Sequence, residues 1–293
     1  MTVEEFLNYL RFERNYSQLT VQSYGEDLRD FESYFKNLDN QLSWEAVDAD
    51  LIRGWMESMM DKGNTATSVN RRLSALRSFY RFALSQGFVE ANPAHAVTGP
   101  RKHHPLPQFM KEREVDELLE HDMWGDDYND MRARTIIMMF YVTGMRLAEL
   151  VGLDDQMVDF ARREISVIGK RNKQRIIPFG DELAETLREY ICLRDQMVDR
   201  QTNALFVTAK GERMKASQVR YVVSKNVRRV TTLKKRTPHV LRHTFATAML
   251  NHEANLESVK KLLGHESLST TEIYTHTTFE QLKKVYQNAH PRA

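Results

Sequence analysis

The chain has 293 residues, 41% of them hydrophobic and 28% charged, a composition typical of a globular protein with room for two domains. No apolar run approaches the roughly 20 residues needed to cross a bilayer, and the single cysteine excludes an internal disulfide framework and a cysteine-based zinc site, so we expect a cytoplasmic protein without a membrane segment. The formal net charge of +2 gives no argument for a nucleic-acid partner, and only the local distribution of charge can supply one.

Residues 1–91 are predicted to form a small helical bundle, because three segments carry apolar residues at helical spacing and no strand pattern is present. The first apolar stripe consists of Val21, Tyr24, Leu28, Phe31 and Phe35. Ser17 and Thr20 are both candidates for the cap of that helix. The third helix is expected to run from about residue 65 to residue 86 and to stop at Gly87.

Residues 92–107 are predicted to be a linker between two domains. They hold four of the chain's seven prolines, at positions 93, 100, 105 and 107, and prolines at this density prevent a continuous helix. The same stretch carries Arg101, Lys102, His103 and His104, so it has the charge to lie along a row of phosphates.

Residues 108–293 are predicted to form a second domain, mostly helical with a small β component. Residues 163–179 alternate apolar and polar side chains, turn through the basic sequence GKRNK and return with two isoleucines, which predicts a β-hairpin. A strand-like run follows at 203–212. The last predicted helix, 279–289, has an apolar stripe that either a neighbouring chain or its own domain would cover.

Charge is unevenly distributed along the chain. Residues 1–61 carry 13 Asp and Glu against 5 Lys and Arg, a net charge of −8, whereas residues 210–236 carry 10 Lys and Arg against one Glu, a net charge of +9. A basic block of this kind attracts a polyanion even when the total charge is near zero, although a solvated basic face is the alternative. A helix predicted from about residue 217 to 230 would turn Arg220, Lys225, Arg228 and Arg229 outward.

The residues that can carry chemistry are cations and one phenol. Arg146 follows Gly144 near a helix start, with Glu149 three residues on, and the sequence HVLRH places His239, Arg242 and His243 on one helical face. His265 follows Gly264, a candidate helix end, and Tyr274 comes nine residues later. Taken singly, each has an ordinary structural explanation, such as a surface ion pair or a packed ring.

Taken together, these side chains fit phosphoryl transfer. Two arginines can each bind a phosphate with two hydrogen bonds, histidines can donate hydrogen bonds or take a proton, and a tyrosine hydroxyl can attack phosphorus. Surrounding positive groups stabilise the charge of the transition state, so we expect neither a metal nor another cofactor. A histidine-based metal site lacks nearby carboxylate or thiolate ligands, and a neighbouring arginine would repel a cation.

In this order and spacing, the sequences TGMRLAEL, GKRNKQR, HVLRHTFAT, LLGHESLSTTEIYTH and HPRA resemble the tyrosine recombinase (λ-integrase-like) family, and most of all its Xer (XerC/XerD-like) branch. The resemblance covers nearly the whole chain. It implies a helical core-binding (SAM-like) bundle at residues 1–91 and a mixed α+β catalytic domain at residues 108–293. It also implies a terminal helix exchanged in trans between protomers.

The resemblance also implies the roles of individual residues. The catalytic set would be Arg146, Lys170, His239, Arg242, His265 and the nucleophile Tyr274. Arg171 stands where the family commonly has a second glycine, which leaves Lys173 as an alternative to Lys170. We expect His243, outside that set, to be packed inside. The candidate DNA contacts are Arg71, Arg72, Arg77, Lys102, Arg220 and Arg228.

The implied function is site-specific recombination of duplex DNA through a 3′-phosphotyrosyl intermediate and a four-way junction. The Xer branch implies chromosome dimer resolution at a dif-type site, with four protomers of one or two related recombinases on two DNA sites, an FtsK-type DNA translocase as a further partner, and association with the nucleoid. The helical bundle begins almost at residue 1, which favours this branch over integrases with an added arm-binding domain. An integrase or invertase of a mobile element, with the same chemistry, is the alternative. A non-catalytic DNA-binding protein of this fold is disfavoured because all six positions are filled.

Overall fold

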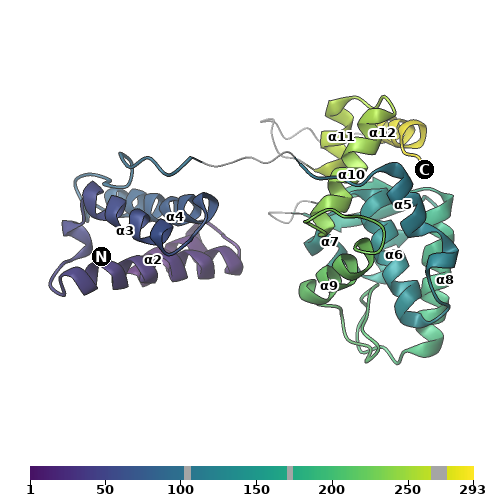
Figure 1. The fold of residues 1–293 in the computed structure, drawn as a ribbon, viewed down its shortest axis with the longest axis horizontal. Coiled ribbons are helices and arrows are strands. Elements are labelled where there is room, and N and C mark those ends of the chain that lie inside the picture. Colours follow the sequence, from purple (N-terminus) through teal and green to yellow (C-terminus); the bar gives the residue numbers. More distant parts are fainter. Residues whose placement is uncertain (102–106, 170–173, 265–275) are drawn as a thin grey trace. The chain divides into compact units, whose positions relative to one another are not determined.

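The protein's structure, a computed structural model, describes residues 1–101, 107–169, 174–264 and 276–293 (Figure 1). The chain divides into two compact units, Met1–Pro105 and Leu106–Ala293, and each has its own hydrophobic core. Both are mainly helical, and the second contains a three-stranded sheet, so the predicted fold class is confirmed. In the described part of the chain, no helix combines the length and the hydrophobicity that a membrane span requires.

The first unit is a bundle of four α-helices with short turns between them. Its elements are α1 (Val3–Asn8), a π-helical turn (Tyr9–Glu13), α2 (Gln18–Leu38), a 3₁₀ turn (Trp44–Ala46), α3 (Ala49–Asp61) and α4 (Ala66–Ser85). Ser17 rather than Thr20 caps α2, since its hydroxyl accepts a hydrogen bond from the Thr20 amide at 3.3 Å. Gly87, with φ of 72°, follows the C-terminus of α4, as predicted.

Part of the predicted linker packs against the first unit. Arg77 on α4 donates hydrogen bonds from Nε to the carbonyl of Ala94 at 3.1 Å and from Nη2 to that of Val97 at 2.6 Å. Both Ala94 and Val97 are buried in the core of this unit. Asn70 binds the carbonyl of Pro100 at 2.8 Å. Residues 92–100 therefore belong structurally to the first unit, while 102–106 lie outside the described residues.

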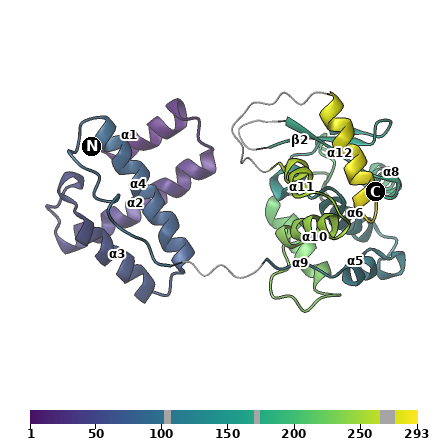
Figure 2. The ribbon, with the colours of Figure 1, turned by 90° about the horizontal axis from the view of Figure 1, so that it is seen from above.

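The second unit is built around α6 (Tyr128–Thr143), which is buried along most of its length and packs against α8 (Asp181–Met197), α9 (Ala216–Val227) and α10 (Pro238–Asn251). Shorter helices complete the unit: α5 (Glu112–Leu119), α7 (Leu147–Val151) and α11 (Leu256–Leu263), with 3₁₀ turns at His121–Met123 and Asp155–Met157. Figure 2 shows α6 among these helices and the sheet at one edge of the unit.

The predicted hairpin is present as β2 (Glu164–Ile168) and β3 (Gln174–Pro178), with a two-residue strand β1 (Val158–Asp159) added on the other side of β2. All pairs are antiparallel, and the register places Ile165 opposite Ile177 and Val167 opposite Arg175. Ile165, Val167 and Ile177 are buried, so one face of the hairpin packs on the core.

The strand-like run at 203–212 does not form a strand and makes isolated bridges only, at Ala204 and Val207. Buried side chains take the place of a neighbouring strand. Tyr190 and Arg194 donate to the carbonyl of Leu205 at 3.0 and 2.8 Å, and Tyr128 and Arg132 each donate to that of Val207 at 2.8 Å. The residues of this run favour β structure, but the carbonyls of Leu205 and Val207 accept hydrogen bonds from side chains instead of from a neighbouring strand.

The chain ends in α12 (His276–Ala289), which begins three residues earlier than predicted and packs against α10 and α11 of its own unit. Leu282 and Tyr286 are 6% and 1% exposed, and both belong to the core of the second unit. In this single chain, the apolar stripe of α12 is thus covered by its own domain.

Candidate active site

Arg146 lies at the junction of α6 and α7. Helix α6 ends at Gly144, whose φ of 59° is left-handed, and a Cβ there would lie 2.5 Å from Cδ1 of Phe245 and 2.8 Å from Cδ2 of Leu263. Only glycine fits, which lets the end of α6 approach both α10 and α11 closely. Arg146 then caps α7 in an extended conformation.

Glu149, three residues after Arg146 and within α7, holds the Arg146 side chain in place. Its carboxylate accepts the backbone amide of Arg146 at 2.6 Å and Nη1 of the same residue at 2.9 Å. The second terminal nitrogen of Arg146, Nη2, donates to the carbonyl of Gly264 at 2.7 Å, at the end of α11. The guanidinium is therefore fixed between two helix ends.

Arg242 comes from α10, the helix predicted from HVLRH, and its side chain reaches the same two helix ends. Nη1 donates to the carbonyl of Gly144 and Nη2 donates to that of Leu263, the latter at 2.7 Å. Only 7% of Arg242 is exposed. Burial, followed by repulsion from Arg146, lowers the pKa of Arg242 to about 10, while Glu149 acts in the opposite direction.

Two arginines separated by 96 positions in the sequence are thus held at one corner, where α6 and α11 both end. Glu149 pairs with Arg146, but the two guanidinium groups still repel each other, which contributes to the lowered pKa of Arg242. Such a corner is suited to bind an anion, which would relieve the repulsion.

The two histidines of HVLRH lie on the solvent side of α10, and here the prediction for His243 was wrong: His243 is exposed, as is His239. Helix α10 buries Val240, Leu241, Thr244 and Phe245, so both histidines fall on the opposite face. Partial burial, followed by the neighbouring His239 and then Arg242, lowers the pKa of His243.

Three of the predicted catalytic residues, Lys170, His265 and Tyr274, lie outside the described residues. Their chain neighbours are described. Strand β2 ends two residues before Lys170, and α12 begins two residues after Tyr274. Gly264, immediately before His265, has a φ of 65° and ends α11, as predicted. No cluster of three or more His, Cys, Asp or Glu side chains within the described residues is placed to hold a metal ion.

One residue of the site was missed by the sequence analysis. Arg175 on β3 donates from Nη1 and Nη2 to the two carboxylate oxygens of Glu149, the second bond being 2.8 Å long. Its side chain is 9% exposed. Glu149 and Arg175 are 26 positions apart, so no helical or strand spacing relates them, and only the arrangement of hairpin and α7 brings them together.

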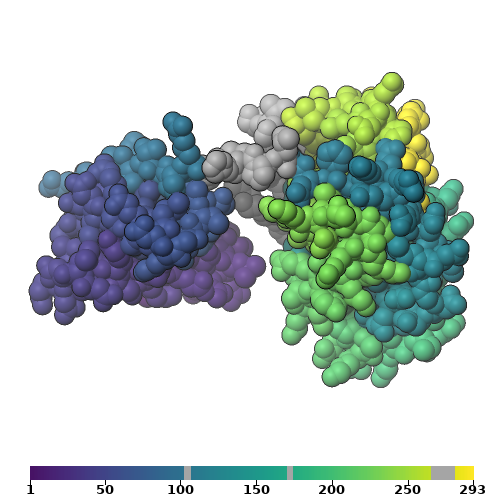
Figure 3. All heavy atoms as spheres, in the orientation of Figure 1, coloured from purple at the N-terminus to yellow at the C-terminus, as the bar shows by residue number. Residues whose placement is uncertain are grey.

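The candidate DNA-binding residues differ in whether their side chains already bind other groups of the same chain. Arg71 pairs with Asp27 through both terminal nitrogens, and Arg72 binds Asp30 at 2.6 Å. Arg77 is occupied by two carbonyls, and Lys102 lies outside the described residues. In contrast, Arg220 on α9 and Arg228, the C-cap of α9, are exposed and have no ion-pair partner among the described residues. Figure 3 shows the segment from α9 to residue 236, in green, at the surface of the second unit.

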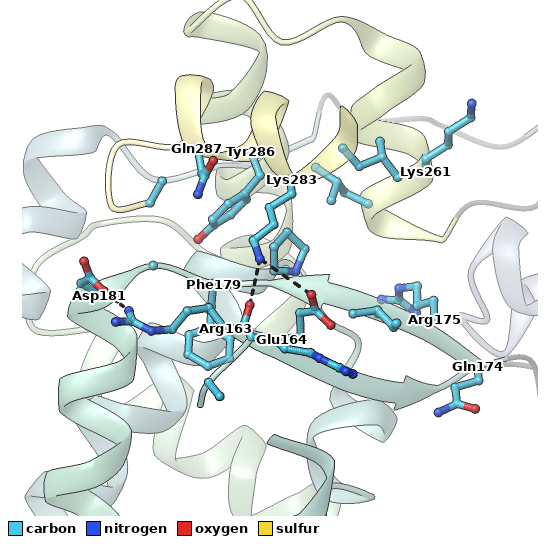
Figure 4. A pocket seen from close by; sticks show the side chains of 18 residues that line it. Arg163, Glu164, Gln174, Arg175, Phe179, Asp181, Lys261, Lys283, Tyr286 and Gln287 are labelled. Carbon is cyan, nitrogen blue, oxygen red and sulfur yellow. Dashed lines mark hydrogen bonds and ion pairs between the residues drawn. The ribbon is translucent and has the colours of Figure 1, made fainter. Parts of the chain in front are cut away.

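A cleft of about 990 Å³ lies beside the hairpin, between β2, β3, α11 and α12 (Figure 4). Lys283 of α12 crosses it, donating to the carbonyl of Arg162 at 2.8 Å and lying 3.7 Å from the carboxylate of Glu164. Arg175 lines the cleft at the end near α11. The cleft thus borders the strand that leads to the hairpin turn.

Known protein families match both units of the chain. Residues 108–281 match the phage integrase family, and residues 3–87 match the phage integrase N-terminal SAM-like domain. Tyrosine recombinase XerC of Vibrio vulnificus strain YJ016 is 39% identical over 291 residues, which cover 99% of this chain and 91% of that protein. XerC of Staphylococcus carnosus is also 39% identical over 291 residues, covering 99% of this chain and 97% of that protein.

Among solved structures, XerH site-specific recombinase bound to palindromic difH substrate shares the fold, with a TM-score of 0.73, 22% identity, and coverage of 97% of this chain and 83% of that chain. Full-length identity of this order to XerC proteins, and family matches over both units, agree with the resemblance drawn from the sequence. The chain therefore belongs to the phage integrase family and is a Xer-like tyrosine site-specific recombinase.

Proposed function

We propose that Arg146, Lys170, His239, Arg242, His265 and Tyr274 form the catalytic set of this recombinase. The observation that carries the proposal is the corner at which Arg146 and Arg242 share the ends of α6 and α11. His239 lies one turn before Arg242 on α10, and Gly264, which accepts from Arg146, immediately precedes His265. A phosphate bound to both arginines would therefore lie near the first turn of α10, which carries His239, and near the end of α11, the helix that precedes His265 in the sequence.

In the proposed reaction the hydroxyl oxygen of Tyr274 attacks the scissile phosphorus of duplex DNA. A bond forms between that oxygen and phosphorus, and the bond from phosphorus to the 5′ oxygen breaks. Lys170, with Lys173 as the alternative, gives a proton to the departing 5′ oxygen, and His239 or His265 takes the phenol proton or donates a hydrogen bond to the phosphate. Arg146 and Arg242 stabilise the additional negative charge of the pentacoordinate transition state.

The 3′-phosphotyrosyl bond conserves the energy of the phosphodiester. The 5′ hydroxyl of a partner strand attacks it, restores the phosphodiester and releases Tyr274. The balance of bonds requires neither ATP nor a redox cofactor. Since the guanidinium groups supply the positive charge, the proposal also requires no metal.

We propose chromosome dimer resolution at a dif-type site as the role, since the chain is 36–39% identical over nearly its full length to several XerC proteins. Integration or inversion by a mobile element remains the second candidate, because the chemistry is the same. The first role includes a related second recombinase and an FtsK-type translocase as partners. It also implies a cytoplasmic, nucleoid-associated location.

Duplex DNA is the proposed partner of both domains, residues 1–91 and 108–293, with residues 92–107 connecting them. Arg220 and Arg228 are the strongest candidates for phosphate contacts, because they are exposed on α9 and at its C-cap, within the segment of net charge +9. Arg71, Arg72 and Arg77 are already paired within the first unit, so any contact with DNA would compete with those partners.

Four protomers on two DNA sites are the proposed assembly, with the terminal helix 279–289 exchanged in trans. The large apolar stripe of α12 supports exchange, because a surface that a protein buries in its own domain can be buried equally in an identical neighbour.

Covalent trapping on genomic DNA of the source organism tests the function. The wild-type chain is expected to yield a DNA–protein adduct after rapid denaturation, and Tyr274→Phe is expected to bind DNA with unchanged affinity and yield none. Tyr16→Phe, which alters an exposed tyrosine of the first unit, serves as the matched control and should trap like wild type.

Sequencing the trapped DNA separates the two roles. A single site near the replication terminus supports dimer resolution, and scattered or promoter-linked sites support a mobile element. Undiminished adduct with Tyr274→Phe would show that another residue is the nucleophile.

A further inference from the structure

Arg175 connects the hairpin to the arginine pair. It lies on β3, opposite Val167 on β2, and its side chain, 9% exposed, extends to Glu149 on α7. Both terminal nitrogens donate to the two carboxylate oxygens, which is the bidentate geometry that fixes orientation as well as distance. In Figure 4, Arg175 lies on the strand that leads back from the turn, beside Gln174.

Glu149 accepts four hydrogen bonds from two arginines. Arg175 supplies two, while the amide and Nη1 of Arg146 supply the others, at 2.6 and 2.9 Å. The carboxylate is 2% exposed, so water cannot replace a lost partner easily. A change in the position or charge of Glu149 would therefore pass directly to Arg146.

Arg175 also contacts the other support of Arg146. A Cβ on Gly264 would approach Cδ and Nη1 of Arg175 to 3.1 Å, which shows how closely the arginine passes this residue. Gly264 is the residue whose carbonyl accepts from Nη2 of Arg146 at 2.7 Å. Arg175 thus lies against both groups that orient Arg146, and it does so from the hairpin.

We propose that Arg175 is a positioning residue for strand cleavage: through Glu149 and Gly264 it fixes the guanidinium of Arg146 and ties strand β3, which leads from the hairpin turn, to the phosphate-binding corner. This inference rests on the proposed function, because it gives Arg146 and the hairpin lysine their roles. It adds to that function a residue that binds neither phosphate nor nucleophile and acts through its neighbours.

The charge of Arg175 has a separate effect from its geometry. Burial by itself would raise the pKa of Glu149, but the hydrogen bonds and charge of Arg175, followed by those of Arg146, outweigh burial and hold it below its ordinary value. Of the described residues, Arg146, Arg175 and Arg242 are the charged groups that act on Glu149. Removing Arg175 removes the largest opposing contribution, so the pKa of Glu149 rises.

The alternative is that Arg175 and Glu149 form an ion pair that only stabilises the fold. Such a pair would affect the unfolding temperature and would alter the cleavage rate only through the folded fraction. It would add no pH dependence to the loss of cleavage rate at temperatures well below unfolding. Substitutions that separate charge from geometry distinguish the two cases.

The test is the rate of covalent adduct formation on a nicked duplex of the site recovered by genomic trapping, between pH 6 and 8.5. We expect Arg175→Gln to lower the rate about 10- to 100-fold, in line with the cost of a small misplacement in a catalytic site. The loss should be greater at the acid end of this range than at the alkaline end, because a raised pKa increases the protonated fraction of Glu149, and the protonated group holds Arg146 less well. Arg175→Lys should lose less and show no such acid limb, because it keeps the charge without the bidentate geometry.

Arg163→Gln is the matched control, because Arg163 pairs with Asp181 at the other end of the same sheet. It should cleave like wild type at every pH, and gel shifts should give all variants the same DNA affinity within about threefold. Arg175→Gln that is folded and cleaves at the wild-type rate at every pH overturns the inference, as does a loss of rate in Arg163→Gln as large as that in Arg175→Gln. Absence of any adduct with wild-type protein would instead contradict the proposed function.

Discussion

At the scale of single residues, two buried basic groups of the second unit have lowered pKa values for different reasons. Arg242 is buried beside another arginine at a corner suited to an anion. His290, 4% exposed, is buried among rings, with centroids 5.4 Å from Phe245 and 5.2 Å from Tyr286. Its Nδ1 accepts the amide of Arg292 at 3.1 Å, so the proton is on Nε2, which faces the carbonyl of Tyr141 at 3.3 Å. We propose that Arg242 binds the scissile phosphate, whereas His290 is held by hydrogen bonds within the protein.

His290 should make the second unit sensitive to acid. Burial lowers its pKa from 6.5 to about 3, so the folded chain stays neutral while the unfolded chain takes a proton below about pH 6.5. Stability is therefore lost as the pH falls from 6.5 toward 3, by about 2 kcal/mol at pH 5 for a shift of this size. Urea unfolding at pH 8 and pH 5 should show that His290→Phe loses about that much less than wild type.

The control for this measurement is His121→Asn, because His121 is an exposed histidine of the same unit. It should follow the wild-type pH dependence. Equal losses between pH 8 and pH 5 for wild type and His290→Phe would show that His290 does not contribute to the acid sensitivity.

The positions of residues at the site were predictable only where the pattern is local or shared with a known family. The positions of Arg146, Glu149 and Arg242 could be predicted because three- and four-residue spacings and a family motif mark them. Arg175 could not, since its contact with Glu149 depends on how β3 crosses α7. The prediction for His243 failed because the buried face of α10 is set by what the helix packs against.

At the scale of elements, helices were predicted well because their apolar periodicity is a local property. The expected 65–86 helix is α4, Ala66–Ser85, and the hairpin at 163–179 is β2 and β3. Strand β1 has two residues, too few to carry a period. The strand predicted at 203–212 is absent, and local periodicity could not show why. The carbonyls of Leu205 and Val207 accept hydrogen bonds from the side chains of Tyr190 and Tyr128, which lie elsewhere in the sequence.

Helix α12 is the element whose partner should change on assembly. Lys283 lies 3.7 Å from the carboxylate of Glu164, so a zero-length carbodiimide should join them within one chain. In the protein without DNA, peptide mapping of the monomer band should find this link. In the complex with two DNA sites, exchange in trans predicts the same link between two chains, in a dimer band on a denaturing gel.

Glu164→Gln is the control for the cross-link, because it removes the reactive carboxylate and should remove the product in both states. A link between Lys283 and Glu164 that stays within one chain in the fully assembled DNA complex would contradict exchange. Such a result would leave the proposed chemistry of Tyr274 untouched, since the two proposals concern different residues.

At the scale of the whole molecule, near-neutrality hides two regions of opposite charge. The net charge of −8 over residues 1–61 and that of +9 over residues 210–236 nearly cancel. Ion pairs inside the fold separate the cations further. Arg71 and Arg72 are paired with Asp27 and Asp30, whereas Arg220 and Arg228 are exposed and have no ion-pair partner among the described residues. The charge available to a DNA backbone is therefore more concentrated on the second unit than a count along the sequence indicates.

This difference predicts how salt should act on variants. Affinity for a random-sequence duplex, measured between 50 and 200 mM salt, falls with a slope set by the number of phosphates neutralised. Arg220→Ala and Arg228→Ala should each reduce that slope by about 1 and weaken binding alike on random duplex and on the recovered site. Arg188→Ala, an exposed arginine on α8, should leave the slope unchanged.

Arg71→Ala provides the decisive comparison, because this arginine already has a carboxylate partner. Displacing Asp27, which is 4% exposed, would leave a buried charge without its partner, so a phosphate contact by Arg71 costs more than one by Arg220. We therefore expect Arg71→Ala to destabilise the first unit and to change the salt slope by less than half as much as Arg220→Ala does. A slope change for Arg71→Ala equal to or larger than that for Arg220→Ala would mean that the ion pair between Arg71 and Asp27 breaks when DNA binds. The first unit would then contact DNA phosphates as readily as α9 does.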